Sequence, residues 1–244
     1  MENAVAPADK GSARDNAAVW LALGNRAVVR INAPGTAWFE ADLARAADHG
    51  CPVMVPKAED PYVLAEIVVR TAGRCPLIPL VETALGVERA VEVCAVAGVV
   101  RAAFGNVDLA AQLGVAHADH LALGHARSRL VLASAASGVH PPVDGVTTAV
   151  GDPYALDTDV TRARRLGFTG KLCIHPAQVP AVTDGFTPTS DELRWARRVA
   201  GAGDGVTTVD GHMVDRPVVE RARVVLARVG EPQPAPGSPA NRVS

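Results

Sequence analysis

Two carboxylates, Glu82 and Asp108, each follow a short apolar run, residues 77–81 and 99–104. Runs of this length, rich in β-branched residues and bounded by Gly or Pro, are typical of buried strands in a parallel sheet. The segment between them has a helical pattern, so the acids lie one strand–helix unit apart, at the carboxyl ends of their strands. Neighbouring strands are about 4.8 Å apart, and both side chains can therefore reach one hard cation.

This pair of acids predicts a magnesium site, because Mg²⁺ is usually held by two carboxylates together with waters and substrate oxygens. The alternative is that one or both acids cap the following helix. Lys57 also follows a strand-like run; it is suited to neutralise a phosphate or carboxylate, or else is a packed or ion-paired lysine. His117, His120 and His125 share one helical stretch without an acid at ligand spacing, so we expect them to be solvated or packed.

Strand-like runs alternate with helical patterns along most of the chain. This alternation predicts an α/β fold with a parallel sheet. The expected strands are residues 27–31, 52–55, 77–81, 99–104, 145–150 and 171–174, with a long helical segment at 117–136. Six strands are two fewer than an eight-stranded (β/α) barrel contains, and residues 1–23 indicate only a loop and one helix.

The pattern changes after residue 174. A hydroxyl cap followed by acids at residues 188–192 predicts a helix that ends near residue 200. A short hairpin or lid at 207–215 and a last helix at 218–229 follow. We therefore expect a (β/α) barrel catalytic domain at 1–185, a helical lid or oligomerisation segment at 186–230, and a disordered tail at 231–244.

The composition excludes several functional classes. The chain has 244 residues, 48% of them apolar, a net charge of −2 and only 4% aromatic residues, so we expect no nucleic-acid partner and no membrane surface. The four cysteines contain no Cys-x-x-Cys pair, and the polar N-terminus lacks a signal segment, which predicts reduced thiols and a cytoplasmic location. The sequence contains neither a Gly-x-Ser-x-Gly elbow nor a P-loop.

Seven segments carry a family resemblance through their order and spacing. They lie at residues 29–32, 55–59, 81–84, 104–109, 170–178, 186–189 and 211–217. Together they resemble the signature segments of the citrate lyase β-subunit-like proteins, within the HpcH/HpaI aldolase superfamily. The resemblance implies a TIM-barrel, (β/α)8 fold and a homotrimer or homohexamer. It also implies Mg²⁺-dependent making or breaking of carbon–carbon bonds in acyl-thioester or 2-oxo-acid substrates.

The resemblance also implies roles for individual residues. Glu82 and Asp108 are the expected metal ligands. Arg30 is expected to bind a carboxylate of the oxo-acid, for which its planar, two-pronged guanidinium is suited. The backbone amides around Gly105 and Asn106 are expected to bind a substrate oxygen.

The resemblance also covers Asp215, near its C-terminal end, and residues 1–5, at its N-terminal end. Asp215 resembles an acid that some relatives insert into a neighbouring subunit's site, where it is the expected acid–base group for the thioester α-carbon. Residues 1–5 resemble the end of the family's Asp-Leu-Glu-Asp motif, with Glu2 at its Glu and Asn3 at its last Asp. We therefore expect a barrel shortened at its N-terminus, with about six strands. The family's contacts to the CoA phosphates come from the segment before this motif.

The expected function is that of a Mg²⁺-dependent lyase. It would cleave a 3-hydroxyacyl-CoA of the citryl-, malyl- or citramalyl-CoA type into an acyl-CoA and a 2-oxo-acid, or run the reverse condensation. The same residues can run a condensation followed by thioester hydrolysis. Two alternatives remain open: a 2-oxo-acid aldolase that does not use CoA, and a degenerate family member that binds a metabolite without turnover.

Overall fold

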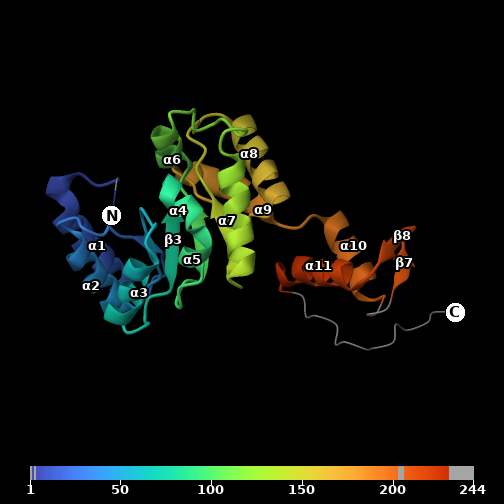
Figure 1. Ribbon diagram of the computed structural model, residues 1–244, viewed down its shortest axis with the longest axis horizontal. Helices are drawn as coiled ribbons and strands as arrows, with labels where there is room; N and C mark the ends of the chain where they lie inside the picture. Colours follow the sequence, from blue (N-terminus) through green and yellow to red (C-terminus); the bar gives the residue numbers. More distant parts are fainter. Residues whose placement is uncertain (1, 3, 203–205, 231–244) are drawn as a thin grey trace. The chain divides into compact units, whose positions relative to one another are not determined.

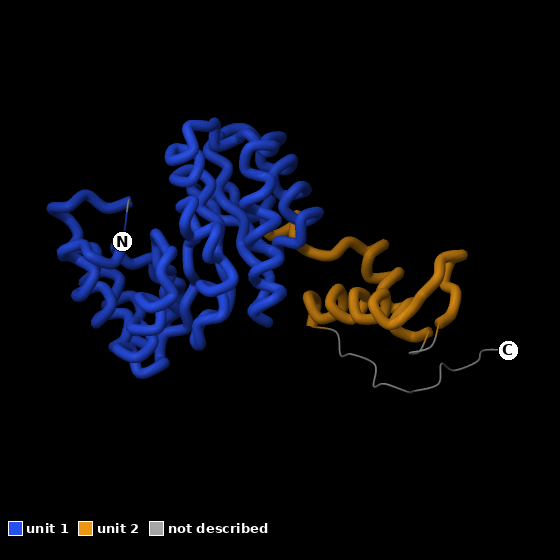
Figure 2. The backbone as a smooth tube through the Cα atoms, in the orientation of Figure 1, with its two compact units in different colours: residues 1–182 blue, residues 183–244 orange. Residues whose placement is uncertain are grey.

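The computed structural model describes residues 2, 4–202 and 206–230 of the chain. These residues form two compact units, residues 1–182 and 183–244, which are shown in Figure 2. The first unit contains the predicted barrel strands, and the second contains the predicted lid segment. The predicted tail, residues 231–244, lies outside the described residues.

The first unit is built on a six-stranded sheet, as the strand count predicted. Each strand pairs in parallel with the next one along the chain, so the spatial order is β1-β2-β3-β4-β5-β6. This is the sequential order of a TIM-barrel-type α/β fold, and it brings all the carboxyl ends to one edge of the sheet. The strands are β1 (Val29–Arg30), β2 (Val53–Val55), β3 (Leu77–Val81), β4 (Arg101–Phe104), β5 (His140–Asp144) and β6 (Gly170–Lys171).

Helices connect these strands and cover the sheet (Figure 1). Every residue of β2 and β3 is buried, as expected for strands of a parallel sheet that is covered on both faces. None of the helices in the described part of the chain combines the length and the apolar character that a membrane span requires. The helical elements of this unit are η1 (Pro7–Asp9), α1 (Lys10–Ala22), α2 (Phe39–His49), α3 (Pro61–Arg70), α4 (Ala84–Glu88), α5 (Ala90–Cys94), α6 (Asn106–Leu113), α7 (Gly124–Ala136), α8 (Pro153–Leu166) and η2 (Pro176–Gln178), and α9 (Val179–Phe186) spans the boundary between the units.

The fifth strand was predicted at the wrong place. Residues 145–150 form a loop and a turn, and β5 lies before them at His140–Asp144. This strand contains Pro141 and Pro142, and proline is disfavoured within a sheet because it cannot donate to the ladder. The sheet accommodates them where the register between β4 and β5 shifts, and the Arg101 guanidinium donates to the Pro141 carbonyl oxygen at 2.7 Å.

The helix predicted at 117–136 is also shorter than expected. It begins at Gly124 as α7, and residues 117–123 form turns on the carboxyl-end side of the sheet. One of these turns is fixed by Asp119, whose side chain accepts from the backbone N–H groups of Leu121 and Ala122 at 2.9 and 3.0 Å. Alanine-rich composition favours a helix, but this local capping bond holds the chain in a turn.

The described residues of the second unit include the two helices and the hairpin that were predicted, after the end of α9. These elements are α10 (Ser190–Ala200), β7 (Thr207–Val209), β8 (His212–Val214) and α11 (Arg216–Ala227). A capping box at Thr189 and Glu192 starts α10 at the predicted position. The last helix begins earlier than predicted, at Arg216, because Asp215 caps it and Pro217 is tolerated in its first turn. Ala196, Val199, Val219, Ala222 and Leu226 form the apolar core of the unit.

Candidate metal and substrate site

Glu82 is held where the ends of two adjacent strands meet. It follows β3 directly, and Gly105 follows β4, whose last residue Phe104 pairs with Val81. The Glu82 side chain is only 5% exposed because it packs against Gly105. A Cβ atom at position 105 would lie 2.3 Å from the Cβ of Glu82, so only glycine leaves room for this carboxylate.

Lys57 connects the two predicted metal ligands. It follows β2 and has a left-handed backbone conformation, with φ = 52°, which is uncommon for a residue with a side chain. In this conformation its backbone N–H donates to Glu82 Oε1 at 2.9 Å. Its ammonium lies 3.7 Å from Glu82 Oε1 and donates a short hydrogen bond to Asp108 Oδ1. One positive charge therefore lies within reach of both carboxylates.

These contacts shift two pKa values. Burial raises the pKa of Glu82 to about 7; the N–H group and the charge of Lys57 oppose this effect, and the charges of Asp108 and Glu2 add to it. For Lys57, burial works against the charged form. The hydrogen bond to Asp108 and the charges of Glu82, Asp108 and Glu2 outweigh burial, so the pKa of Lys57 is raised. The acids here repel one another and are stabilised by a cation between them.

The residues present fit a hard divalent cation. Glu82 and Asp108 already approach one cation position, which the Lys57 ammonium marks. Glu82 is buried and the Asp108 side chain is 35% exposed, which leaves an open side for waters and substrate oxygens. In the described residues, no group of three or more His, Cys, Asp or Glu side chains could hold a metal. Two carboxylates suit Mg²⁺, which keeps several waters, better than Zn²⁺.

Arg30 lies at the end of β1 and has a partner that the sequence analysis did not assign to the site. Its Nε is paired with Glu2 Oε2 at 3.1 Å, and the Arg30 side chain is 35% exposed. Glu2 is in turn fixed by Lys10, whose ammonium donates to the Glu2 carbonyl oxygen at 3.0 Å. Its position in the sequence could have identified Glu2 as a site residue, because it stands where the family's motif has a glutamate.

Gly105 and Asn106 connect the site to the rest of the sheet. The Gly105 N–H donates to the Val81 carbonyl oxygen at 2.9 Å. The Asn106 side chain is buried and bonds both backbone groups of Val146, with Oδ1 accepting at 2.8 Å and Nδ2 donating at 3.1 Å. The amide of Gly105 therefore belongs to the sheet ladder, and the predicted substrate contact depends on the amides that begin α6.

Asp215 lies in the second unit as the N-cap of α11. Its side chain accepts from the backbone N–H of Val218 at 3.4 Å. Capping is a structural role, so a catalytic role for Asp215 remains a prediction. An Asn at this position would keep the cap but could not act as a base.

The fold and the site define a class: a TIM-barrel-type α/β protein with one acid after a strand and a second in the first turn of the helix after the next strand, both beside one cation position. The chain belongs to the HpcH/HpaI aldolase/citrate lyase family, whose profile matches residues 1–176. The resemblance found in the sequence is therefore confirmed at the level of the family.

Similar proteins include the citrate lyase subunit beta-like protein of Mycobacterium tuberculosis, 36% identical over 95% of this chain and 86% of that protein. A (3S)-malyl-CoA thioesterase of Cereibacter sphaeroides is 34% identical over 93% of this chain and 84% of its own length. The mitochondrial citramalyl-CoA lyase of Rattus norvegicus is 31% identical, covering 81% of this chain and 67% of that enzyme.

A solved structure with the same fold is that of CitE from Mycobacterium tuberculosis in complex with magnesium, acetoacetate and coenzyme A. It is 33% identical to this chain, has a TM-score of 0.78, and the match covers 95% of this chain and 89% of that one. The two chains therefore share sequence as well as the order of their strands, as members of one family do.

The contact between Gly105 and Glu82 generates the first prediction. Gly105→Ala should destabilise the protein by about 1–3 kcal/mol, since the new methyl group overlaps Glu82 and overpacking forces the strand ends apart. Gly124→Ala is the matched control, because a Cβ there meets no atom within 4 Å. Urea unfolding of both variants measures the difference. If the two variants are equally stable, the Glu82 side chain does not require a glycine at position 105.

Proposed function

We propose that this chain is a Mg²⁺-dependent carbon–carbon lyase. Its proposed substrate is a 3-hydroxyacyl-CoA of the citryl-, malyl- or citramalyl-CoA type, which it converts to an acyl-CoA and a 2-oxo-acid, or makes in the reverse direction. The observation that carries this proposal is the convergence of Glu82 and Asp108 on one cation position. The names of the relatives and the magnesium and coenzyme A in the CitE structure support it.

Glu82 and Asp108 hold the metal in this proposal, and Arg30 binds the carboxylate of the oxo-acid. When bound, Mg²⁺ supplies a Lewis acid that polarises the oxo-acid carbonyl. Glu2 orients the Arg30 guanidinium through Nε, and the partial exposure of Arg30 allows a substrate carboxylate to reach it. The ammonium of Lys57 leaves the cation position when the metal binds, and then pairs with a carboxylate or phosphate of the substrate.

The remaining parts of the proposal concern the lid and the assembly. Asp215 moves the proton at the α-carbon of the acyl thioester, in a homotrimer or homohexamer in which it reaches a neighbouring subunit's site. The amides that begin α6, next to Gly105 and Asn106, bind a substrate oxygen. We place the protein in the cytoplasm, because all four cysteines are free thiols, which suits a reducing compartment.

Thioester hydrolysis after condensation is the second candidate function. The relative named (3S)-malyl-CoA thioesterase favours it, since that protein covers nearly the whole chain at a similar identity. The two candidates differ in products: the lyase releases an acyl-CoA and a 2-oxo-acid, whereas hydrolysis releases free CoA and a hydroxy acid. Product analysis with malyl-CoA or citramalyl-CoA separates them.

The metal assignment predicts the effect of removing one charge without changing shape. Glu82→Gln or Asp108→Asn should weaken Mn²⁺ and Mg²⁺ binding by more than about 100-fold, a loss at least as large as that for residues that only orient ligands. Lyase activity should fall with it while the protein stays folded. Glu92→Gln, on the exposed face of α5, is the matched control. Calorimetric titration with near-normal affinity in either site variant would contradict the assignment.

The role of Arg30 predicts a change in substrate binding with the charge kept. Arg30→Lys should raise the KM for the 2-oxo-acid in the condensation direction by about tenfold or more, since an ammonium cannot make the two-pronged contact. The binding of Mg²⁺ alone should change little. An unaltered KM for the oxo-acid would remove Arg30 from the substrate site.

The role of Asp215 predicts a result that capping alone cannot give. Asp215→Asn should keep α11 folded and lose most activity. Mixed with the inactive Glu82→Gln protein under conditions of subunit exchange, it should recover activity at roughly a quarter of the sites, because some interfaces then pair two wild-type residues. Full activity of Asp215→Asn would leave only the capping role. No recovery in exchanged mixtures would place Asp215 outside a neighbour's site.

A further inference from the structure

A buried lysine lies behind the Arg30 end of the candidate site. Lys10 is the first residue of α1 and is only 6% exposed, although every other residue of that helix is partly or fully exposed. Its ammonium donates to the Glu2 carbonyl oxygen at 3.0 Å and to Asn32 Oδ1 at 2.5 Å, and lies 5.1 Å from the centre of the Trp38 ring. Burying an ammonium is costly unless it is hydrogen-bonded, so these acceptors fix its position.

Asn32 links this ammonium to a buried carboxylate. It lies two residues after Arg30 and is 3% exposed. Its backbone N–H and its Nδ2 group both donate to Asp42 Oδ2, at 2.9 and 2.5 Å. Asp42 is fully buried in α2 and also accepts from Arg14 Nε at 2.8 Å. Because a carboxylate can only accept hydrogen bonds, the Asn32 amide must turn its oxygen toward Lys10. We call Lys10, Asn32 and Asp42 the Lys10 network.

The Lys10 network ends at Glu2, which faces the candidate site. The Glu2 carbonyl oxygen accepts from the Lys10 ammonium and from the backbone N–H of Val5, the latter at 3.1 Å. The Glu2 carboxylate pairs with Arg30 Nε at 3.1 Å. Burial is the main cause of the raised pKa of Glu82, and the charge of Glu2 adds to it, so Glu2 acts on the metal site as well. The Arg30 side chain is 35% exposed, so a substrate meets this arrangement at Arg30.

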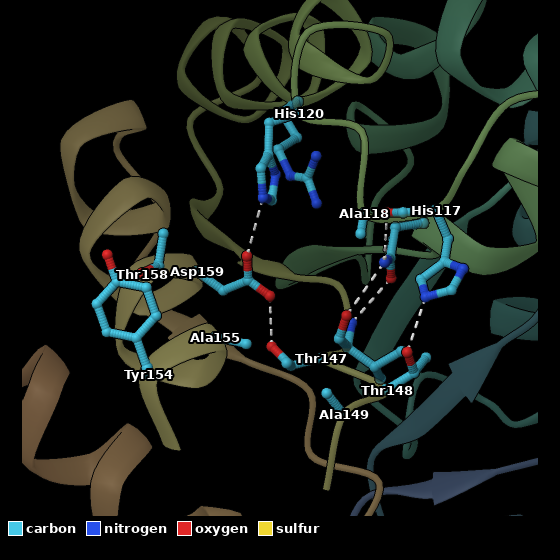
Figure 3. A pocket seen from close by; sticks show the side chains of 13 residues that line it. His117, Ala118, His120, Thr147, Thr148, Ala149, Tyr154, Ala155, Thr158 and Asp159 are labelled. Carbon is cyan, nitrogen blue, oxygen red and sulfur yellow. Dashed lines mark hydrogen bonds and ion pairs between the residues drawn. The ribbon is translucent and has the colours of Figure 1, made fainter. Parts of the chain in front are cut away.

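A second buried lysine provides a comparison within the same unit. Lys171, in β6, is 7% exposed, and its ammonium donates to the Gly145 carbonyl oxygen at 2.6 Å. It lies 3.8 Å from carboxylate oxygens of both Asp144 and Asp159, and Asp144 also pairs with Arg127 at 2.8 Å. Asp159 lines the pocket between α8 and the loops after β4 and β5 that Figure 3 shows. Two cations thus face two acids, and this group is balanced without a ligand.

We propose that Lys10 is a positioning residue for the substrate site. Its ammonium, held by Asn32, fixes the backbone of Glu2, and the Glu2 carboxylate in turn holds the Arg30 guanidinium in the orientation that binds a substrate carboxylate. A two-pronged contact requires a fixed guanidinium plane, and such a plane is supplied by the residues behind it. The inference rests on the proposed function for its effect on the substrate. The effect on Arg30 itself is measurable without any substrate.

The exchange of the Arg30 Nε–H proton with water tests the contact in the full-length protein without metal or substrate. Arg30→Lys removes this proton resonance and so assigns it. In Lys10→Met the proton should exchange at least about fivefold faster, because Glu2 no longer holds Nε. Lys10→Gln keeps a donor of shorter reach and should shift the rate in the same direction, so it serves if the methionine variant does not fold.

Pyruvate binding in the presence of Mg²⁺ tests the consequence for the site. Calorimetric titration of Lys10→Met should show pyruvate binding about fivefold weaker or worse, because the free protein must now order Arg30 on binding. The binding of Mg²⁺ alone should change little. In an Arg30→Lys background, Lys10→Met should have little further effect, since the two residues act in one interaction. If the wild-type protein binds no pyruvate, the proposed function is wrong, and the proton exchange still decides the role of Lys10.

Lys171→Met is the matched control. It removes a similarly buried ammonium, whose contacts in the described part of the chain do not include Glu2 or Arg30. It should lower stability in urea and leave both the Arg30 exchange rate and pyruvate binding as in the wild type. The proposal is overturned if the Arg30 Nε–H proton exchanges at the wild-type rate in a folded Lys10 variant, or if Lys171→Met speeds that exchange equally.

Discussion

The site depends on the repulsion between two carboxylates that the fold brings together. Glu82 is buried beside Asp108, and burial together with that neighbouring charge raises the pKa of Glu82 to about 7. Lys57 reduces the repulsion between the two carboxylates: its ammonium lies between them, and its backbone N–H donates to Glu82. The cost of burying the acids is offset by a cation, and a divalent ion can offset it more fully than a lysine.

The surrounding residues leave the side chains of Glu82 and Asn106 little choice of position. Gly105 gives Glu82 its room, since any side chain at that position would overlap it. Asn106 ties α6 to the loop after β5 through both backbone groups of Val146. Gly145 is required for this contact, because a Cβ there would lie 2.2 Å from Asn106 Oδ1. The side chains of Glu82 and Asn106 thus each occupy space that only a glycine opposite them leaves free.

Much of the fold, and the closeness of Glu82 to Asp108, could be predicted from the sequence, because the signals are local. The apolar run at Leu77–Val81 predicted the bounds of β3 correctly, and the order of strand and acid predicted that Glu82 and Asp108 lie at one edge of the sheet. The capping box at Thr189 gave the start of α10 in the same way. Local signals failed at β5, where an irregular pairing with β4 tolerates two prolines.

The parts that could not be predicted depend on contacts between distant segments. The pair of Arg30 with Glu2 and the pair of Arg127 with Asp144 appear only when separate segments of the chain are brought together. The left-handed conformation of Lys57 has no signal in its residue type, because lysine is not enriched there. His120 was expected to be solvated or packed, and its contact with Asp159 depends on α8, which is distant in the sequence.

The most direct test of the central claim is a crystal structure of the protein soaked with Mn²⁺, with data collected at the manganese absorption edge. The account predicts an anomalous peak with carboxylate oxygens of both Glu82 and Asp108 at about 2.0–2.2 Å, as for a hard octahedral cation, and the Lys57 ammonium displaced from between them. An ordered Lys57 still bridging the two acids, with no anomalous peak beside them at saturating Mn²⁺, would contradict it.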